Sequence, residues 1–207
     1  MSLELLLIRH GDVPGIHPPR FRGRQDLQLT DLGRVQACAL GQWLKQQLTL
    51  RAIYSSPLQR CRDTAQAIAQ PQGCAVHVQA ELNDTDYGRW TGLLHEQVAH
   101  DFPEAYAAWK QDPGINPPPD GETLRQVELR ALAALHAVTS QHSEGTVALV
   151  THDAVVRVMI LHMLQAPLTH YARLRQDPTA INRVEVLGPD SFRIALVNGT
   201  AHLQRAA

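Results

Sequence analysis

The sequence predicts an α/β protein: a three-layer sandwich whose mostly parallel sheet carries helices on both faces. Three observations lead to this prediction. Short apolar runs alternate along the chain with segments of helical periodicity. The runs at 3–8 and 146–151 are apolar throughout, which is typical of strands covered on both sides. The end of the chain alternates between apolar and polar residues, like two antiparallel strands.

The first half of the chain contains two strand–helix pairs. After the strand at 3–8, a loop rich in glycine and proline leads to a helix that Thr30 can cap. Apolar side chains recur along this helix at spacings of three and four, which predicts its buried face. They are Leu32, Val35, Ala39, Leu40, Trp43 and Leu44. A strand at 51–56 precedes a helix that we expect to begin at Pro57 and to end near Ala69.

The second half begins with an irregular segment at about 81–122 that contains only short helical pieces. We expect this segment to be an inserted lid and residues 1–207 to form a single domain. The other elements that we expect are strands at 74–78, 146–151, 181–187 and 192–197, a long helix from 124 to about 138, and a helix at 154–164.

Composition narrows the classes of function. The formal net charge is -1, with 19 Lys and Arg against 20 Asp and Glu, so no overall field favours nucleic acid or an anionic membrane as a partner. No apolar run approaches the roughly 20 residues of a membrane span, and no signal-peptide pattern is visible. The three cysteines are scattered, which argues against a disulfide framework. We therefore expect a soluble, cytoplasmic protein.

Polar residues follow three of the predicted strands at the point where each strand ends. They are Arg9, His10 and Gly11 after the first strand, Arg60 after the second, and His152 and Asp153 after the strand at 146–151. Each residue alone is more often structural than functional. The carboxyl ends of parallel strands meet at one sheet edge, however, and arginines with helix N-termini there favour a phosphate group.

A metal site is the main alternative, because the chain has 11 histidines. No pair of histidines has the spacing of a metalloprotease motif, and no cysteine lies near a histidine at zinc-finger spacing. A glycine-rich nucleotide loop of the Walker type is also missing from the sequence. We expect neither a metal nor another cofactor.

The motifs resemble those of the histidine phosphatase superfamily, the phosphoglycerate mutase-like proteins. The segments "LIRHG", "GRQDLQLTDLGRVQA", "SSPLQRCRDTA", "DYGRWTG", "PPPDGE" and "ALVTHDAVVRV" occur in the order typical of that family. The resemblance extends over nearly the whole chain and is to the short bacterial-type branch. The loop "PPRFRGRQDLQLT" is similar to that of α-ribazole phosphatase-like members. The resemblance implies hydrolysis of a small phosphorylated metabolite through a phosphohistidine, without a metal.

The resemblance also implies a role for individual residues. His10 corresponds to the nucleophile that accepts the phosphoryl group. Arg9, Arg60 and His152 correspond to the other members of the phosphate pocket. Four more residues are expected to contact or border the substrate. They are Gly11, Arg22, Gly23 and Asp153.

The general acid is the main departure from the family pattern. Short members usually carry a glutamate in a Leu-x-Glu-x-x-x-Gly pattern, whereas this chain has "LNDTDYG", with Asp84 at that position. Aspartate is one methylene shorter, and a general acid must lie within hydrogen-bonding reach of the leaving oxygen. Asp153 offers a second route, because the "HD" pair resembles the acid phosphatase branch. We expect Asp84 to be the acid and keep Asp153 as the rival.

Three functional classes therefore stay open on the sequence. Hydrolysis is favoured because mutases of the family tend to be longer and to carry a basic tail. A non-catalytic protein that binds phosphoryl groups is the second reading, since the usual acid is changed. A phosphotransferase of the mutase type is the third. Trp90, Tyr106 and Trp109 are expected to pack within the lid, with a substrate cleft as the alternative. The sequence predicts neither the substrate nor the oligomeric state.

Overall fold

A computed structural model of the chain describes residues 2–205. Within this range, six strands form one sheet in the order β3-β2-β4-β1-β5-β6. The strands are β1 (Leu3–Arg9), β2 (Leu50–Ser55), β3 (Val76–Val78), β4 (Gly145–Thr151), β5 (Ile181–Gly188) and β6 (Ser191–Gly199). β3, β2, β4 and β1 run parallel to one another, whereas β5 is antiparallel to both of its neighbours, β1 and β6. The mostly parallel sheet agrees with the prediction.

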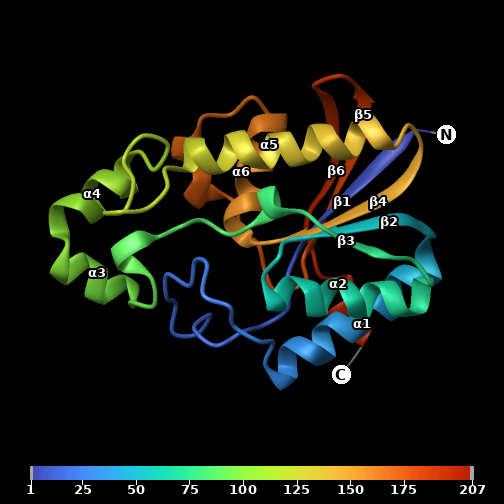
Figure 1. Ribbon diagram of the computed structural model, residues 1–207, viewed down its shortest axis with the longest axis horizontal. Helices are drawn as coiled ribbons and strands as arrows, with labels where there is room; N and C mark the ends of the chain where they lie inside the picture. The colour runs from blue at the N-terminus through green and yellow to red at the C-terminus, as the bar shows by residue number, and fades with distance from the viewer. Residues whose placement is uncertain (1, 206–207) are drawn as a thin grey trace.

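Helices cover both faces of the sheet, as Figure 1 shows. The α-helices are α1 (Asp31–Gln47), α2 (Gln59–Gln72), α3 (His95–Asp101), α4 (Pro103–Gln111), α5 (Leu124–Gln141) and α6 (Asp153–Met163). Short 3₁₀ segments are η1 (Ala80–Leu82), η2 (Gly88–Trp90), η3 (Leu168–Arg173) and η4 (Ala201–Arg205). Alternate residues of β1 enter different cores. Leu5 and Leu7 pack with α5 and α6, and Leu6 and Ile8 pack with α1 and α2. These layers confirm the predicted sandwich.

The register of the central strands brings together the polar residues that directly follow each strand. β1 and β4 are parallel, with Arg9 opposite Thr151. His10 and His152 therefore leave the sheet together, and the His10 N–H donates to the Thr151 carbonyl oxygen at 2.9 Å. Ser55 ends β2 on the other side of β4. The carboxyl ends of three strands thus bring their following residues to one edge of the sheet.

Two predictions about helices were wrong in part. Leu32 and Val35, expected on the buried face of α1, are each 57% exposed. The buried face instead includes Gly33 and Gly41, where a Cβ atom would run into a neighbouring backbone carbonyl. The close approach that these glycines permit turns the larger residues outward. Helix α2 begins at Gln59, two residues after Pro57, and continues to Gln72.

Residues 81–122 contain short helices, as predicted. In Figure 1, α3 and α4 lie apart from the sheet, on the side toward which β1 runs. Their apolar side chains form a separate cluster with Phe21, Tyr87, Trp90 and Val98, distinct from the two clusters that flank the sheet. Trp90 is fully buried in this cluster, which agrees with its expected packing role. Within residues 2–205, no helix is both long and apolar enough to cross a membrane.

Candidate active site

His10 lies directly after β1 and is only 1% exposed. Its Nδ1 lies 2.7 Å from the Gly11 carbonyl oxygen. A carbonyl oxygen only accepts, so Nδ1 carries the proton, and the lone pair on Nε2 of the neutral ring accepts from Arg60 Nε. Burial and the nearby charges of Arg60, His152 and Arg9 hold the pKa of His10 well below its usual value. The imidazole is therefore neutral and able to act as a nucleophile through Nε2.

Gly11 makes this arrangement of the backbone possible. A Cβ atom on Gly11 would lie 2.6 Å from the Gly33 carbonyl oxygen, closer than any side chain tolerates. The Gly11 N–H donates to Thr64 Oγ1 at 3.1 Å, and the Thr64 hydroxyl donates in turn to the Arg60 carbonyl at 2.7 Å. The turn after β1 is thereby fixed against α2.

Arg60 lies in the first turn of α2 and is fully buried. Its Nε donates to His10 Nε2 at 3.2 Å. Nη1 donates to the Gln25 carbonyl at 2.6 Å, and Nη2 donates to the Gly23 carbonyl at 2.7 Å and to Asp84 Oδ2 at 2.9 Å. A guanidinium group that is held by four partners is positioned rigidly beside Nε2 of His10.

Asp84 joins the two sides of this cluster. Its Oδ2 accepts from Arg60 and lies 3.4 Å from His152 Nδ1, while Oδ1 accepts from the Thr85 N–H at 2.8 Å. The carboxyl group is only 4% exposed. Burial raises the pKa of Asp84, against the opposing charge of Arg60. Asp84 is thus the carboxyl group of the site that most readily takes up a proton.

His152 precedes α6 and is fully buried. Its Nε2 lies 2.8 Å from Ser56 Oγ, and its ring lies edge-on to that of His10 with a centroid separation of 5.2 Å. Burial, followed by the charges of Arg60 and Arg130, holds the pKa of His152 well below its usual value. Two neutral imidazoles therefore lie side by side at the end of the parallel strands.

Arg9 and Asp153 lie on the wall of the adjoining cavity. Arg9 Nη1 donates to the Gln176 carbonyl at 2.5 Å, and its buried Nε has no partner among the described residues. Asp153, the first residue of α6, lies 3.4 Å from Arg157 Nη2. Burial acts to raise the pKa of Asp153, but the charges of Arg9, Arg157 and Arg22 outweigh it and hold that pKa well below the usual range. Asp153 is therefore ionised at neutral pH.

Arg22 and Gly23 border the same cavity, as predicted. Arg22 Nη1 donates to the Gly15 carbonyl at 2.7 Å, and its buried Nε has no partner among the described residues. Gly23 has a φ of +50°, a left-handed conformation that glycine adopts without strain, and its carbonyl accepts from Arg60. The loop before α1 thus binds Arg60 through the Gly23 carbonyl oxygen and places Arg22 at the cavity.

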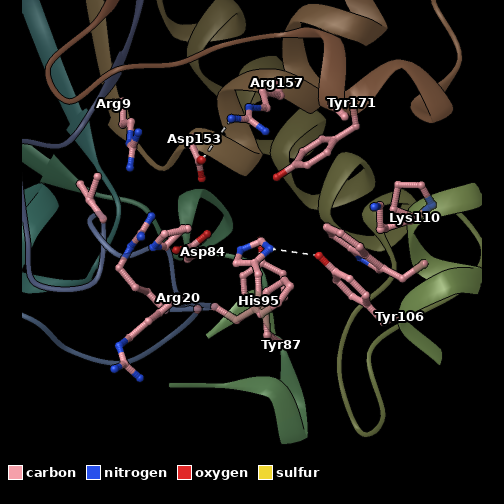
Figure 2. A pocket seen from close by; sticks show the side chains of 18 of the residues that line it. Arg9, Arg20, Asp84, Tyr87, His95, Tyr106, Lys110, Asp153, Arg157 and Tyr171 are labelled. Carbon is pink, nitrogen blue, oxygen red and sulfur yellow. Dashed lines mark hydrogen bonds and ion pairs between the residues drawn. The ribbon is translucent and has the colours of Figure 1, made fainter. Parts of the chain in front are cut away.

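The cavity has a volume of about 420 Å³, within the range of small-molecule sites. The predicted residues that line it are Arg9, Arg22, Gly23, Asp84 and Asp153. His10, Arg60 and His152 are almost fully buried beside it and contact Asp84 directly or through one another. Figure 2 shows Arg9, Asp84 and Asp153 on one side of the cavity and Lys110 and Tyr106 on the other. The structure therefore brings together all nine predicted site residues.

Several supporting residues were not predicted from the sequence. Three of them make hydrogen bonds to predicted site residues: Ser56 to His152, Thr64 to Gly11 and Gln176 to Arg9. Arg157 lines the cavity and pairs with Asp153 one turn earlier on α6. The i,i+4 spacing of these two charges on a helix was the one signal that pointed to such a pair. Within residues 2–205, no group of three or more His, Cys, Asp or Glu side chains is arranged to hold a metal ion.

Known proteins resemble this chain along most of its length. The family model described as histidine phosphatase superfamily (branch 1) matches residues 5–200. A phosphoserine phosphatase 1 of Hydrogenobacter thermophilus is 32% identical over 169 residues, which are 82% of this chain and 80% of that protein. The structure of a mycobacterial glucosyl-3-phosphoglycerate phosphatase superposes with a TM-score of 0.87 at 25% identity, covering 96% of this chain and 100% of the other.

Some relatives are longer than this chain. A bifunctional protein of Mycobacterium tuberculosis is 31% identical over 200 residues, which are 97% of this chain but only 55% of that protein. The chain thus spans about half the length of this relative. The match of the family model over nearly all of the chain and the grouping of Arg9, His10, Arg60 and His152 lead to the same conclusion. The chain belongs to the histidine phosphatase superfamily, branch 1.

Proposed function

We propose that the chain is a metal-independent phosphomonoester hydrolase that acts through a phosphohistidine on His10. One observation carries the proposal: His10 Nδ1 donates to the Gly11 carbonyl, and Nε2 faces the guanidinium of Arg60 at 3.2 Å. The lone pair that attacks phosphorus is thus on the ring nitrogen beside a fixed cation. An incoming phosphate group would be attracted to the atom that attacks it.

The reaction has two displacements. His10 Nε2 forms a bond to phosphorus in line with the ester oxygen, the bond between phosphorus and that oxygen breaks, and the alkoxide takes a proton from the general acid. Water then attacks the phosphohistidine, gives a proton to the same carboxylate, and releases inorganic phosphate and neutral His10. Arg9 and Arg60 stabilise the charge on the phosphoryl oxygens in both steps. The positive charge comes from side chains, so a metal is not needed.

Asp84 is the proposed general acid. Its raised pKa supports a protonated form that can donate to the leaving alkoxide. Asp153 has the opposite tendency, because the cations around it keep it ionised. We assign Asp153 to the wall of the phosphate site, where its carboxylate orients Arg157 at 3.4 Å and its backbone N–H, at the start of α6, faces the phosphate group.

The substrate is a small phosphorylated metabolite. The relatives named for phosphoserine and for glucosyl-3-phosphoglycerate support this size class. We further propose that residues 1–207 act as one domain in which 81–122 forms a lid. The separate aromatic cluster of α3 and α4 supports this role, because it is packed on its own and borders the cavity.

The test is hydrolysis of p-nitrophenyl phosphate in excess chelator. We expect wild-type protein to turn over and His10→Ala to be inactive. His136→Ala is the matched control, because His136 pairs with Asp190 on the surface and does not line the cavity. A covalent phosphoprotein trapped in wild type by an alkaline denaturing quench, and missing in His10→Ala, would identify the intermediate, because phosphohistidine survives alkali and is hydrolysed in acid. Turnover that needs a metal, or that survives in His10→Ala, would overturn the proposal.

A further inference from the structure

The cavity has a wall of aromatic rings facing the phosphate-binding residues. The chain contains only three Phe, three Trp and four Tyr residues. Five of these line the cavity, and His95 adds a further ring: they are Phe21, Tyr87, Tyr106, Trp109 and Tyr171. A phosphate group is held by guanidinium groups and N–H donors, so it does not need such a wall. The rings instead offer a packing surface for the part of the substrate that carries the phosphate.

The rings are held in place by one another. Phe21, which is 2% exposed, stacks on His95 with a centroid distance of 4.1 Å and an angle of 18°. It also meets Tyr87 edge-on at 4.9 Å. The His95 ring lies 3.4 Å from the Tyr106 hydroxyl. Since each ring is braced by a neighbour, the wall has its shape before any ligand binds, which lowers the entropy cost of recognition.

Two rings of α4 complete the wall at the far end. Tyr106 and Trp109 lie nearly parallel, at 10° and 6.1 Å, and both are partly exposed. Trp109 meets Tyr171 of η3 edge-on at 6.4 Å, so this ring joins the α4 segment to the body of the protein. Figure 2 shows Tyr106 across the cavity from Arg9. A substrate whose phosphate lies near Arg9 would therefore extend toward the rings of α4.

Three cations also border this side of the cavity. Arg157 lies 4.9 Å above the Tyr171 ring and 3.4 Å from Asp153. Lys110 lies 5.6 Å from the centre of the Tyr106 ring. Arg20 donates to the Gly92 carbonyl at 2.9 Å. Arg157 and Lys110 thus lie over aromatic rings, whose faces attract cations, and Arg157 Nε has no hydrogen-bond partner among the described residues. A ring that packs against Tyr106 and Trp109 would therefore lie beside these cations as well.

We propose that the physiological substrate is a phosphate monoester of an alcohol that carries a planar aromatic ring. The phosphate group lies beside Arg9 and His10, and the ring of the leaving alcohol packs against Tyr106 and Trp109. This inference rests on the proposed phosphatase function and adds to it the chemical class of the leaving group.

The test compares two esters that differ only in the ring. 2-Phenylethyl phosphate and 2-cyclohexylethyl phosphate have leaving alcohols of similar basicity, so the chemical step is matched. We expect wild-type kcat/KM to favour the phenyl ester by roughly three- to tenfold, the contribution of one aromatic contact. Trp109→Leu should abolish this preference. Trp43→Leu, the same change in α1 at a residue that does not line the cavity, should retain it.

Each outcome decides the inference. A phenyl preference that depends on Trp109 supports it. Equal rates for the two esters, or faster hydrolysis of phosphoserine than of the phenyl ester, overturn the ring preference and leave the phosphatase function intact. Hydrolysis of none of the three esters contradicts the phosphatase function itself. Calorimetric titration then decides the ring preference separately: tighter binding of the phenyl ester supports it, and equal binding overturns it.

Discussion

Replacing Asp84 with asparagine tests which carboxyl group protonates the leaving alcohol. The change keeps the size of the side chain and removes its acidic proton. In the structure, Oδ1 accepts from the Thr85 N–H at 2.8 Å and Oδ2 accepts from Arg60 at 2.9 Å. Asparagine has one oxygen and one NH2 group, so in either orientation the NH2 group faces a donor. One of the two hydrogen bonds is therefore lost.

The Asp84→Asn change should affect both the stability of the protein and the rate of hydrolysis. Loss of one hydrogen bond at a buried group should lower the free energy of unfolding by about 1–3 kcal/mol. Loss of a general acid should slow hydrolysis of an alkyl phosphate by roughly 10²–10⁴, which corresponds to about 3–5 kcal/mol in the barrier. The two effects can be separated, because the first is measured by urea unfolding and the second by rates under conditions in which the variant is folded.

The assay measures release of the alcohol from two esters in a single turnover, because this release reports the first displacement alone, before water attacks. We expect Asp84→Asn to lose most of its rate with 2-phenylethyl phosphate and little with p-nitrophenyl phosphate, because nitrophenolate leaves without protonation. Asp153→Asn is the matched control. Asp153 is ionised among cations, so its loss should affect both esters alike. A wild-type rate of Asp84→Asn with the alkyl ester, or equal losses with both esters, would refute Asp84 as the acid.

Two further predictions concern stability. Lowering the pH from about 7.5 to about 5.5 should lower the free energy of unfolding. His10 and His152 stay neutral when folded, whereas the unfolded chain takes up protons near pH 6.5. Their contribution to the free energy of unfolding is complete above that pH. It is lost, by up to about 1.4 kcal/mol per histidine and pH unit, as the pH falls toward their lowered folded pKa values. The raised pKa of Asp84 opposes this loss in part, because the folded protein takes up a proton on Asp84 more readily than the unfolded chain does. Urea midpoints that do not fall would contradict it. Asn182→Leu should lower the free energy of unfolding by roughly 2–4 kcal/mol, because the buried Asn182 amide makes two hydrogen bonds of 2.8 and 2.9 Å with Gln176. An unchanged melting temperature of this variant would contradict the prediction.

Much of the fold was predictable because its signals are local. The all-apolar runs of β1 and β4 predicted central strands, and the spacing of Leu124, Val127 and Ala131 predicted the buried face of α5, which the structure confirms. The face of α1 was predicted less well. Leu32 has the right spacing for a core residue, but the close approach of Gly33 to the loop after β1 decides which side faces inward.

The position of the site was also predictable. Arg9, His10 and His152 directly follow strands, and parallel strands bring such residues to one edge whatever the details of packing. Asp84 was harder to place, since it lies in an irregular segment and its partner Arg60 is 24 residues away. The supporting Gln176 is 167 residues from Arg9, and no pattern in the chain linked the two.

The layers of the fold and the edge of the sheet where the site lies could be predicted from the sequence, because both depend on residue order within and directly after each strand. The protonation states of the site residues, in contrast, depend on the folded structure. The proton on His10 Nδ1, the raised pKa of Asp84 and the lowered pKa of Asp153 all depend on burial and on charges from distant segments. The aromatic wall likewise forms only when Phe21 meets the rings of α3 and α4 in space. Contacts of that kind have no periodicity along the chain, so no sequence pattern predicts them.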